Sequence, residues 1–183
     1  FGLDHIGSSE MAAFADYDND GDVDVYLLTN RVFSGQLPAE IIADVTPPTG
    51  TTLSTDQMAP PKLIAKLDGK PYFCGEPDLL LRNDGGRFRD VTASAGIADQ
   101  GMGLGVHWWD YDADGWQDLY VANDLESPDR LYHNNGDGTF DDVTNAALPQ
   151  TAYFGMGVDS GDIDNDGHLD LIVADMSSTT HFK

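Results

Sequence analysis

Aspartates recur at alternate positions in three short segments of the chain, each with a glycine at the same place. Segments 16–24, 110–118 and 162–170 all follow the pattern Asp-x-Asp-x-Asp-Gly-x-x-Asp. A tight loop can point alternate carboxylates at one centre, and Ca²⁺ takes about six to eight oxygen ligands in a flexible shell. The pattern therefore predicts calcium binding.

We expect ligands from positions one, three, five, seven and nine of each loop. Glycine at position six permits the sharp turn, and position seven would offer its main-chain carbonyl, so its side chain varies. One ion per loop gives about three Ca²⁺. The predicted ligands are Asp16, Asp18, Asp20, Asp22 and Asp24; Asp110, Asp112, Asp114, Trp116 and Asp118; and Asp162, Asp164, Asp166, His168 and Asp170.

Position twelve separates these loops from an EF-hand, which would place a bidentate Glu there. The residues found are Leu27, Val121 and Val173. They lie in apolar runs that favour strands over helices, so each site is predicted to lie in a β-hairpin and to end at its ninth residue. Mg²⁺ demands stricter octahedral geometry, and Zn²⁺ prefers His or Cys side chains, which the loop pattern does not supply.

The charge balance agrees with a cation-binding chain. Of 183 residues, 9 are Lys or Arg and 32 are Asp or Glu, which gives a formal net charge of −23. Such a chain repels phosphate backbones, so we expect no nucleic-acid partner. No stretch is apolar enough for membrane insertion, while a hydrophobic content of 40% excludes a disordered acidic tail.

A second sequence segment repeats together with the loops, and its pattern indicates the fold. Residues 80–92 match 131–144, at nearly the same spacing that separates the second and third loops. One full unit is predicted to hold four strands, at 104–109, 118–122, 130–133 and 139–143, with a turn at 135–138. The predicted fold class is all-β, built of propeller blades with four antiparallel strands each.

The spacing also divides the chain. The distance from the first loop to the second exceeds the period by about 42 residues, which predicts an insertion. We interpret it as a surface excursion, with one helical turn near 37–45. The predicted divisions are residues 1–30, the first part of a blade with loop one; 31–77, the insertion; 78–95, the outer strands of that blade; 100–148, a second blade; and 152–183, a partial third blade.

These loops and strands resemble the FG-GAP, or VCBS-type, repeat of integrin α-subunit propellers. Stretches 75–83, 118–124, 131–140 and 155–162 look closer still to bacterial proteins similar to the cartilage acidic protein family. The resemblance implies a propeller of about seven blades, an extracellular, cell-surface or periplasmic location, and a role in adhesion or assembly. Two units and half of a third do not close a propeller. We therefore expect a piece of a larger protein, or closure by other subunits.

Other polar and aromatic residues, mostly outside the loops, are of types that can take part in catalysis or ligand binding. We expect structural or surface roles for His5, His107, His133, His168 and His181, because no nucleophile–base arrangement can be assembled around them. We expect packing roles for Trp108, Trp109 and Trp116, with an exposed sugar-stacking platform as the alternative. Asp124, Glu126 and Asp129 are expected to form a solvated turn. Cys74 is a lone cysteine, so no internal disulfide forms.

Three functions stay open at this stage. The first is a non-enzymatic, calcium-stabilised propeller segment in adhesion or structural assembly, with a protein or glycan partner. The second is a polysaccharide-acting enzyme on a propeller scaffold. The third is a binding module attached to another catalytic or redox domain. An enzyme would need a pocket with perturbed carboxylates outside the loops.

Overall fold

A computed structural model of the chain describes Leu3 and residues 8–31, 63–67, 70–97, 99–124 and 127–176. Within these residues, regular structure is almost entirely antiparallel β, with one short helix, α2 (Thr144–Ala147). The predicted all-β fold class is confirmed. The first four-stranded sheet has the order β1 (Ser8–Ala15), β2 (Asp24–Arg31), β5 (Leu79–Asn83) and β6 (Phe88–Asp90).

The second sheet repeats the first and matches the predicted strands to within one residue at each end. Its order is β7 (Gly103–Trp109), β8 (Asp118–Asn123), β9 (Arg130–Asn134) and β10 (Phe140–Asp142). Every residue of β8 is buried. This strand lies between β7 and β9 and carries the run Leu-Tyr-Val-Ala, which suits a strand covered on both faces.

A third hairpin, β11 (Gly155–Gly161) and β12 (Asp170–Asp175), repeats the opening of the other two sheets. The ninth aspartate of the loop pairs with the residue before the first: Ala15 with Asp24, Trp109 with Asp118, and Gly161 with Asp170. A register shift near the start of the first strand also recurs in all three hairpins. The strands therefore present the three loops in one geometry.

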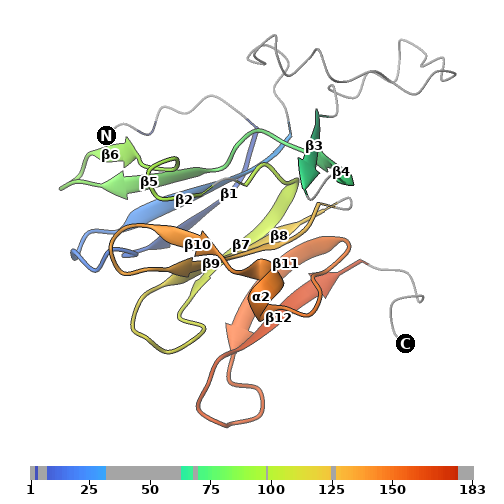
Figure 1. Cartoon of the computed structure of the whole chain (residues 1–183). Coiled ribbons are helices and arrows are strands. Elements are labelled where there is room, and N and C mark those ends of the chain that lie inside the picture. The colour runs from blue at the N-terminus through green and yellow to red at the C-terminus, as the bar shows by residue number, and fades with distance from the viewer. Residues whose placement is uncertain are drawn as a thin grey trace, which may run out of the picture.

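The predicted insertion, residues 31–77, contains regular structure that the sequence did not indicate. Strands β3 (Leu63–Leu67) and β4 (Lys70–Cys74) pair as an antiparallel hairpin. This hairpin projects beside the first sheet (Figure 1). The helical turn predicted near 37–45 lies outside the described residues.

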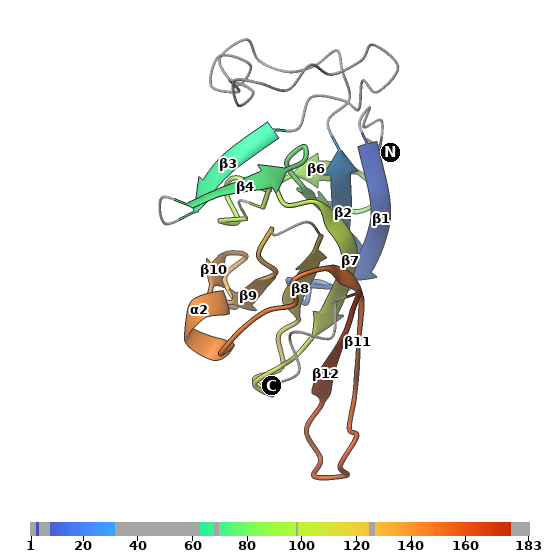
Figure 2. The ribbon, with the colours of Figure 1, turned by 90° about the vertical axis from the view of Figure 1, so that its right-hand side faces the viewer.

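The two four-stranded sheets and the β11–β12 hairpin pack face to face, and their first strands β1, β7 and β11 lie side by side along one edge (Figure 2). Twelve buried residues fill the space between the first two sheets, among them Tyr17, Tyr26, Leu28, Trp108 and Phe140. A smaller group around Trp109, Tyr120 and Leu131 packs against residues of the third hairpin. The core is therefore divided between successive sheets, as in propeller blades.

Glycines allow the first strands to approach one another. A Cβ on Gly105 would lie 3.0 Å from the Cα of Gly157, and one on Gly103 would lie 2.3 Å from Leu28 Cδ1. In the second unit, Gly103 and Gly105 are therefore required for close packing, because a side chain at either position would collide with a neighbouring strand.

Candidate metal centres

The first aspartate of each loop holds the turn through its own carboxylate. In the first loop, Asp16 Oδ1 accepts the main-chain N–H of Asp20 and Oδ2 accepts that of Gly21, both at 3.0 Å. Asp110 makes the same two bonds at 3.0 and 2.9 Å, and Asp162 at 3.0 and 3.1 Å. The three loops are therefore one structure repeated, and not merely one sequence pattern.

Positions four and six of each loop have positive φ. Gly21, Gly115 and Gly167 have φ between 90° and 93°, as the predicted sharp turn requires. Position four also lies in the left-handed region, with φ of 57° at Asn19, 61° at Ala113 and 60° at Asn165. Asn tolerates this conformation better than Ala does, so the second loop carries backbone strain at Ala113.

The ninth aspartate ties each loop to the sheet behind it. Asp24 accepts the main-chain N–H of Tyr17 at 3.2 Å and that of Asn83, on β5, at 2.8 Å. Asp118 does the same with Tyr111 and, on β9, Asn134. Both aspartates are completely buried, and burial raises the pKa of Asp24 to about 6 and that of Asp118 above its usual range. Position nine therefore has a structural role beside its predicted role as a ligand.

Carboxylate oxygens from positions one, three and nine converge in every loop. Within each group the oxygens lie within 4.8 Å of one another: Asp16, Asp18 and Asp24; Asp110, Asp112 and Asp118; and Asp162, Asp164 and Asp170. In the first loop, Asp18 Oδ1 is buried and has no hydrogen-bond partner among the described residues, and burial raises the pKa of Asp18. A buried carboxylate oxygen without a donor fits a hard cation that seeks oxygen ligands.

Positions five and seven do not join the convergent carboxylates of positions one, three and nine in the described loops. The aspartate at position five accepts the N–H of position seven: Asp20 from Asp22, Asp114 from Trp116 and Asp166 from His168, at 2.8 to 2.9 Å. None of the three belongs to the groups formed by positions one, three and nine. The predicted ligand roles of positions five and seven stay predictions.

The structure brings His133 close to the second loop, although the sequence predicted only a structural or surface role for this residue. Asp112, Asp114 and His133 also place donor atoms within 4.8 Å of one another. His133 lies on β9, and only its spatial position relates it to the loop.

The two repeated sheets contain a matching pair of buried aspartates that sequence reasoning missed. Tyr26 donates its hydroxyl proton to Asp78 at 2.8 Å, and Tyr120 donates to Asp129 at 2.6 Å. Asp129 was expected in a solvated turn, but it is fully buried, and burial raises its pKa to about 6. That expectation was wrong for Asp129, because the carboxylate also accepts main-chain N–H groups from Asn123 and Ala152. Asp124 is half-buried, and Glu126 lies outside the described residues.

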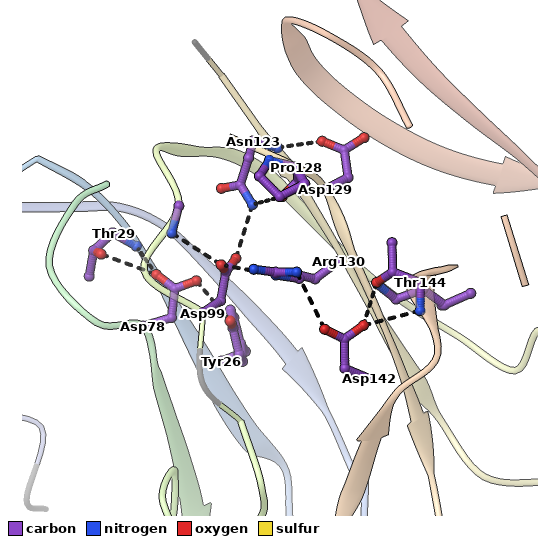
Figure 3. Close-up of polar contacts among 12 residues, drawn as sticks. Tyr26, Thr29, Asp78, Asp99, Asn123, Pro128, Asp129, Arg130, Asp142 and Thr144 are labelled. Carbon is purple, nitrogen blue, oxygen red and sulfur yellow. Dashed lines mark hydrogen bonds and ion pairs between the residues drawn. The ribbon is translucent and has the colours of Figure 1, made fainter. Parts of the chain in front are cut away.

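A buried ion pair joins β9 to Asp99, in the segment that leads into the second sheet (Figure 3). Arg130 Nε lies 3.6 Å from Asp99 Oδ1, and its Nη1 lies 3.4 Å from Asp142 Oδ2. Asp99 Oδ2 also accepts a hydrogen bond from Asn123. Burial raises the pKa of Asp99, while Arg130 opposes that shift. Since Asp99 precedes the second unit and Asp78 of the first donates its N–H to the Asp99 carbonyl, the network joins the two units.

A cavity of about 600 Å³ lies beside this network, and Asp78, Asp90 and Asp99 are among its lining residues. It is the kind of pocket that an enzyme would need. However, Asp78 accepts hydrogen bonds from Tyr26 and Thr29, and Asp99 accepts them from Gly101 and Asn123. Both carboxylates are held by the fold, so no specific observation assigns them a catalytic role.

The tryptophans have separate places. Trp108 and Trp109 are buried, in the two different core groups, which confirms their packing role and excludes them from a sugar-stacking platform. Trp116 is half-buried in the second loop and lies against Gly136, whose Cβ would come within 2.8 Å of the indole.

Four-stranded antiparallel sheets in which an aspartate loop joins the first two strands define a tandem-repeat β protein of the blade type. Residues 110–173 match the FG-GAP-like repeat, which confirms the predicted resemblance. Human cartilage acidic protein 1 is 34% identical over 85 residues, and the mouse protein of the same name is 33% identical over 85 residues. Each match covers 46% of this chain and 13% of the relative. The described residues include no helix long and apolar enough to cross a membrane.

Proposed function

We propose that each of the three aspartate loops binds one Ca²⁺ and that the bound ions stabilise the hairpins. The observation that carries the proposal is the repeated carboxylate group, with donor oxygens within 4.8 Å of one another in loops that share positive φ at positions four and six. Positions one, three and nine would hold the ion first. Position five and the carbonyl of position seven would complete an all-oxygen shell.

Converging carboxylates repel one another, and a divalent cation would remove that repulsion. Three Ca²⁺ add six positive charges and change the formal net charge from −23 to −17. Because the loops hold this geometry only in the folded chain, binding would add to the free energy of unfolding. Calcium would act as a structural ion, one in each unit.

The proposed role of the whole protein is non-enzymatic. It is a segment of a secreted or cell-surface propeller of about seven blades, in adhesion or structural assembly, with a protein or glycan partner. The FG-GAP-like repeat and the similarity to cartilage acidic protein 1 support this proposal.

The third hairpin supports the proposal that further units of the same kind pack here. Ile172 aligns with Tyr26 and Tyr120, which the next unit buries, yet it is 55% exposed. Ile163 and Leu169 at the same hairpin are also exposed. A further unit, from the parent chain or another subunit, would cover this face.

Thermal unfolding with and without calcium tests the proposal. The chain is stripped with EGTA and titrated with Ca²⁺, and unfolding is followed by tryptophan fluorescence, to which Trp108, Trp109 and Trp116 all contribute. We expect the melting temperature to rise with calcium, since one site at about 100 times its Kd contributes about 2.7 kcal/mol. Mg²⁺ at the same concentration is the control and should act more weakly. An unchanged melting temperature in EGTA would contradict the proposal.

A further inference from the structure

The imidazole of His133 approaches the second loop from β9. Its Nδ1 lies 3.3 Å from Asp118 Oδ1 and 3.5 Å from Asp112 Oδ2. Nδ1 is buried and makes no hydrogen bond among the described residues. An edge contact with Tyr111, with ring centroids 5.9 Å apart, helps to fix the ring. A desolvated ring nitrogen thus sits beside carboxylates without a hydrogen bond to either.

We propose that Asp112, Asp114 and His133 form a site for a divalent transition-metal ion, with Zn²⁺ as the representative. Their donor atoms lie within 4.8 Å of one another. One imidazole and two carboxylates are a ligand set that Zn²⁺ accepts, with a fourth position open, whereas Ca²⁺ favours oxygen alone. Two ligands of a tetrahedral zinc ion lie about 3.4 Å apart, close to the 3.5 Å between His133 Nδ1 and Asp112 Oδ2.

The first loop supplies an internal comparison. Arg82 occupies the place of His133 there, because Leu81 pairs with Val25 as Tyr132 pairs with Leu119. Arg82 is a permanent cation and binds Asp84 through Nε at 2.8 Å. It offers no lone pair to a metal ion, so the transition-metal site belongs to the second loop and not to the first.

Asp112 belongs both to the group with His133 and to the oxygen-only group with Asp110 and Asp118. A calcium ion in the loop and a zinc ion at His133 would therefore compete for one carboxylate. This competition is the part of the inference that rests on the proposed calcium function; the zinc site itself stands on the placement of His133.

Zinc titration of the whole chain, with and without Ca²⁺, tests the inference through the imidazole NMR signals of His133. We expect one equivalent of Zn²⁺ to perturb Nδ1 of His133 and leave His107 unchanged. In the presence of Ca²⁺ the same change should require more zinc. Zinc binding that is indifferent to calcium would overturn the shared role of Asp112, and an unperturbed His133 in both arms would overturn the site.

Two variants complete the test by calorimetry. His133→Gln should weaken zinc binding about tenfold or more, because even outer partners of metal ligands have effects of that size. Arg82→His should create a second zinc site in the first loop. Unchanged zinc affinity in His133→Gln would show that His133 is only ion-paired. If calcium fails to bind any loop while zinc binds His133, the proposed function fails alone; if calcium binds and zinc ignores His133, this inference fails alone.

Discussion

Tyr120 donates its hydroxyl proton to Asp129 at 2.6 Å, in the same way that Tyr26 binds Asp78 in the preceding unit. The bond joins a central strand to the segment that enters the third strand. In the second unit Asp129 also accepts the N–H of Ala152, which leads into the third hairpin. The pair therefore links a strand, a turn and the next unit.

Asp129 should make stability depend on pH. Burial raises its pKa in the folded chain to about 6, above the ordinary value, so the folded state holds the proton more tightly. Its contribution is fully present below about pH 4 and is lost as pH rises through about 6. In the wild type, the free energy of unfolding should fall by up to about 3 kcal/mol over that range, at about 1.4 kcal/mol per pKa unit. Asp129→Asn should not show this fall, because asparagine does not titrate. Urea unfolding of both proteins, at one calcium concentration, measures the difference at each pH.

Tyr120→Phe is the matched variant for this prediction. The tyrosine hydroxyl lowers the pKa of Asp129, so its removal should move the loss of stability to higher pH. If wild type and Asp129→Asn respond to pH in parallel, the buried carboxylate is not the titrating group.

Arg130 should be indispensable to the junction of the first two units. Replacing it with Met leaves Asp99 buried without its counter-ion, and breaking a buried pair typically costs about 3–5 kcal/mol. The double variant Arg130→Met with Asp99→Asn should recover part of that loss, because it removes the orphaned charge. Chemical unfolding of the single and double variants decides this, and strictly additive losses would argue against coupling between the two residues.

Ala113 should be a site where substitution stabilises the chain. Its φ of 61° costs a residue with a Cβ about 1 kcal/mol, and Asn bears this conformation more easily. Ala113→Asn should therefore raise the free energy of unfolding by roughly 0.5–1 kcal/mol. The reverse exchange, Asn165→Ala in the third loop, should lower it by a similar amount. A loss of stability in Ala113→Asn would show that position four is not strained.

Gly105 and Gly157 occupy corresponding places but should respond differently to alanine. A Cβ on Gly105 would meet the backbone of Gly157 and Val158 at 3.0 and 3.3 Å, while one on Gly157 meets nothing within 4 Å. Gly105→Ala should destabilise by about 1–3 kcal/mol through overpacking, and Gly157→Ala should have little effect. Equal losses in melting experiments would show that the close approach of the first strands does not matter.

The repeated features were predictable because each copy in the sequence checks the others. Three aligned loops indicated the turn glycines and the ninth aspartate, and strands of the second sheet were predicted to within one residue. The β3–β4 hairpin was not predicted from the sequence, because it occurs in a single unit and has no second copy to compare.

Buried polar residues were the main omission. An aspartate after proline in a turn normally indicates solvent exposure, so Asp129 gave no sign of burial by itself. A signal existed in the comparison of the two units: Pro77-Asp78 and Pro128-Asp129 both precede a third strand, and both units carry a tyrosine on the second strand. His133 was missed because a contact across strands leaves no local pattern.

The most direct test of the central proposal is a count of calcium ions by native mass spectrometry on wild type and three single variants. The variants are Asp18→Asn, Asp112→Asn and Asp164→Asn, since position three joins each carboxylate group but leaves in place the N–H of the loop glycine bonded to Asp16, Asp110 or Asp162. We predict three ions in the wild type and two in each variant. A wild-type chain that retains no calcium, or variants that retain the wild-type number, would contradict calcium binding by these loops.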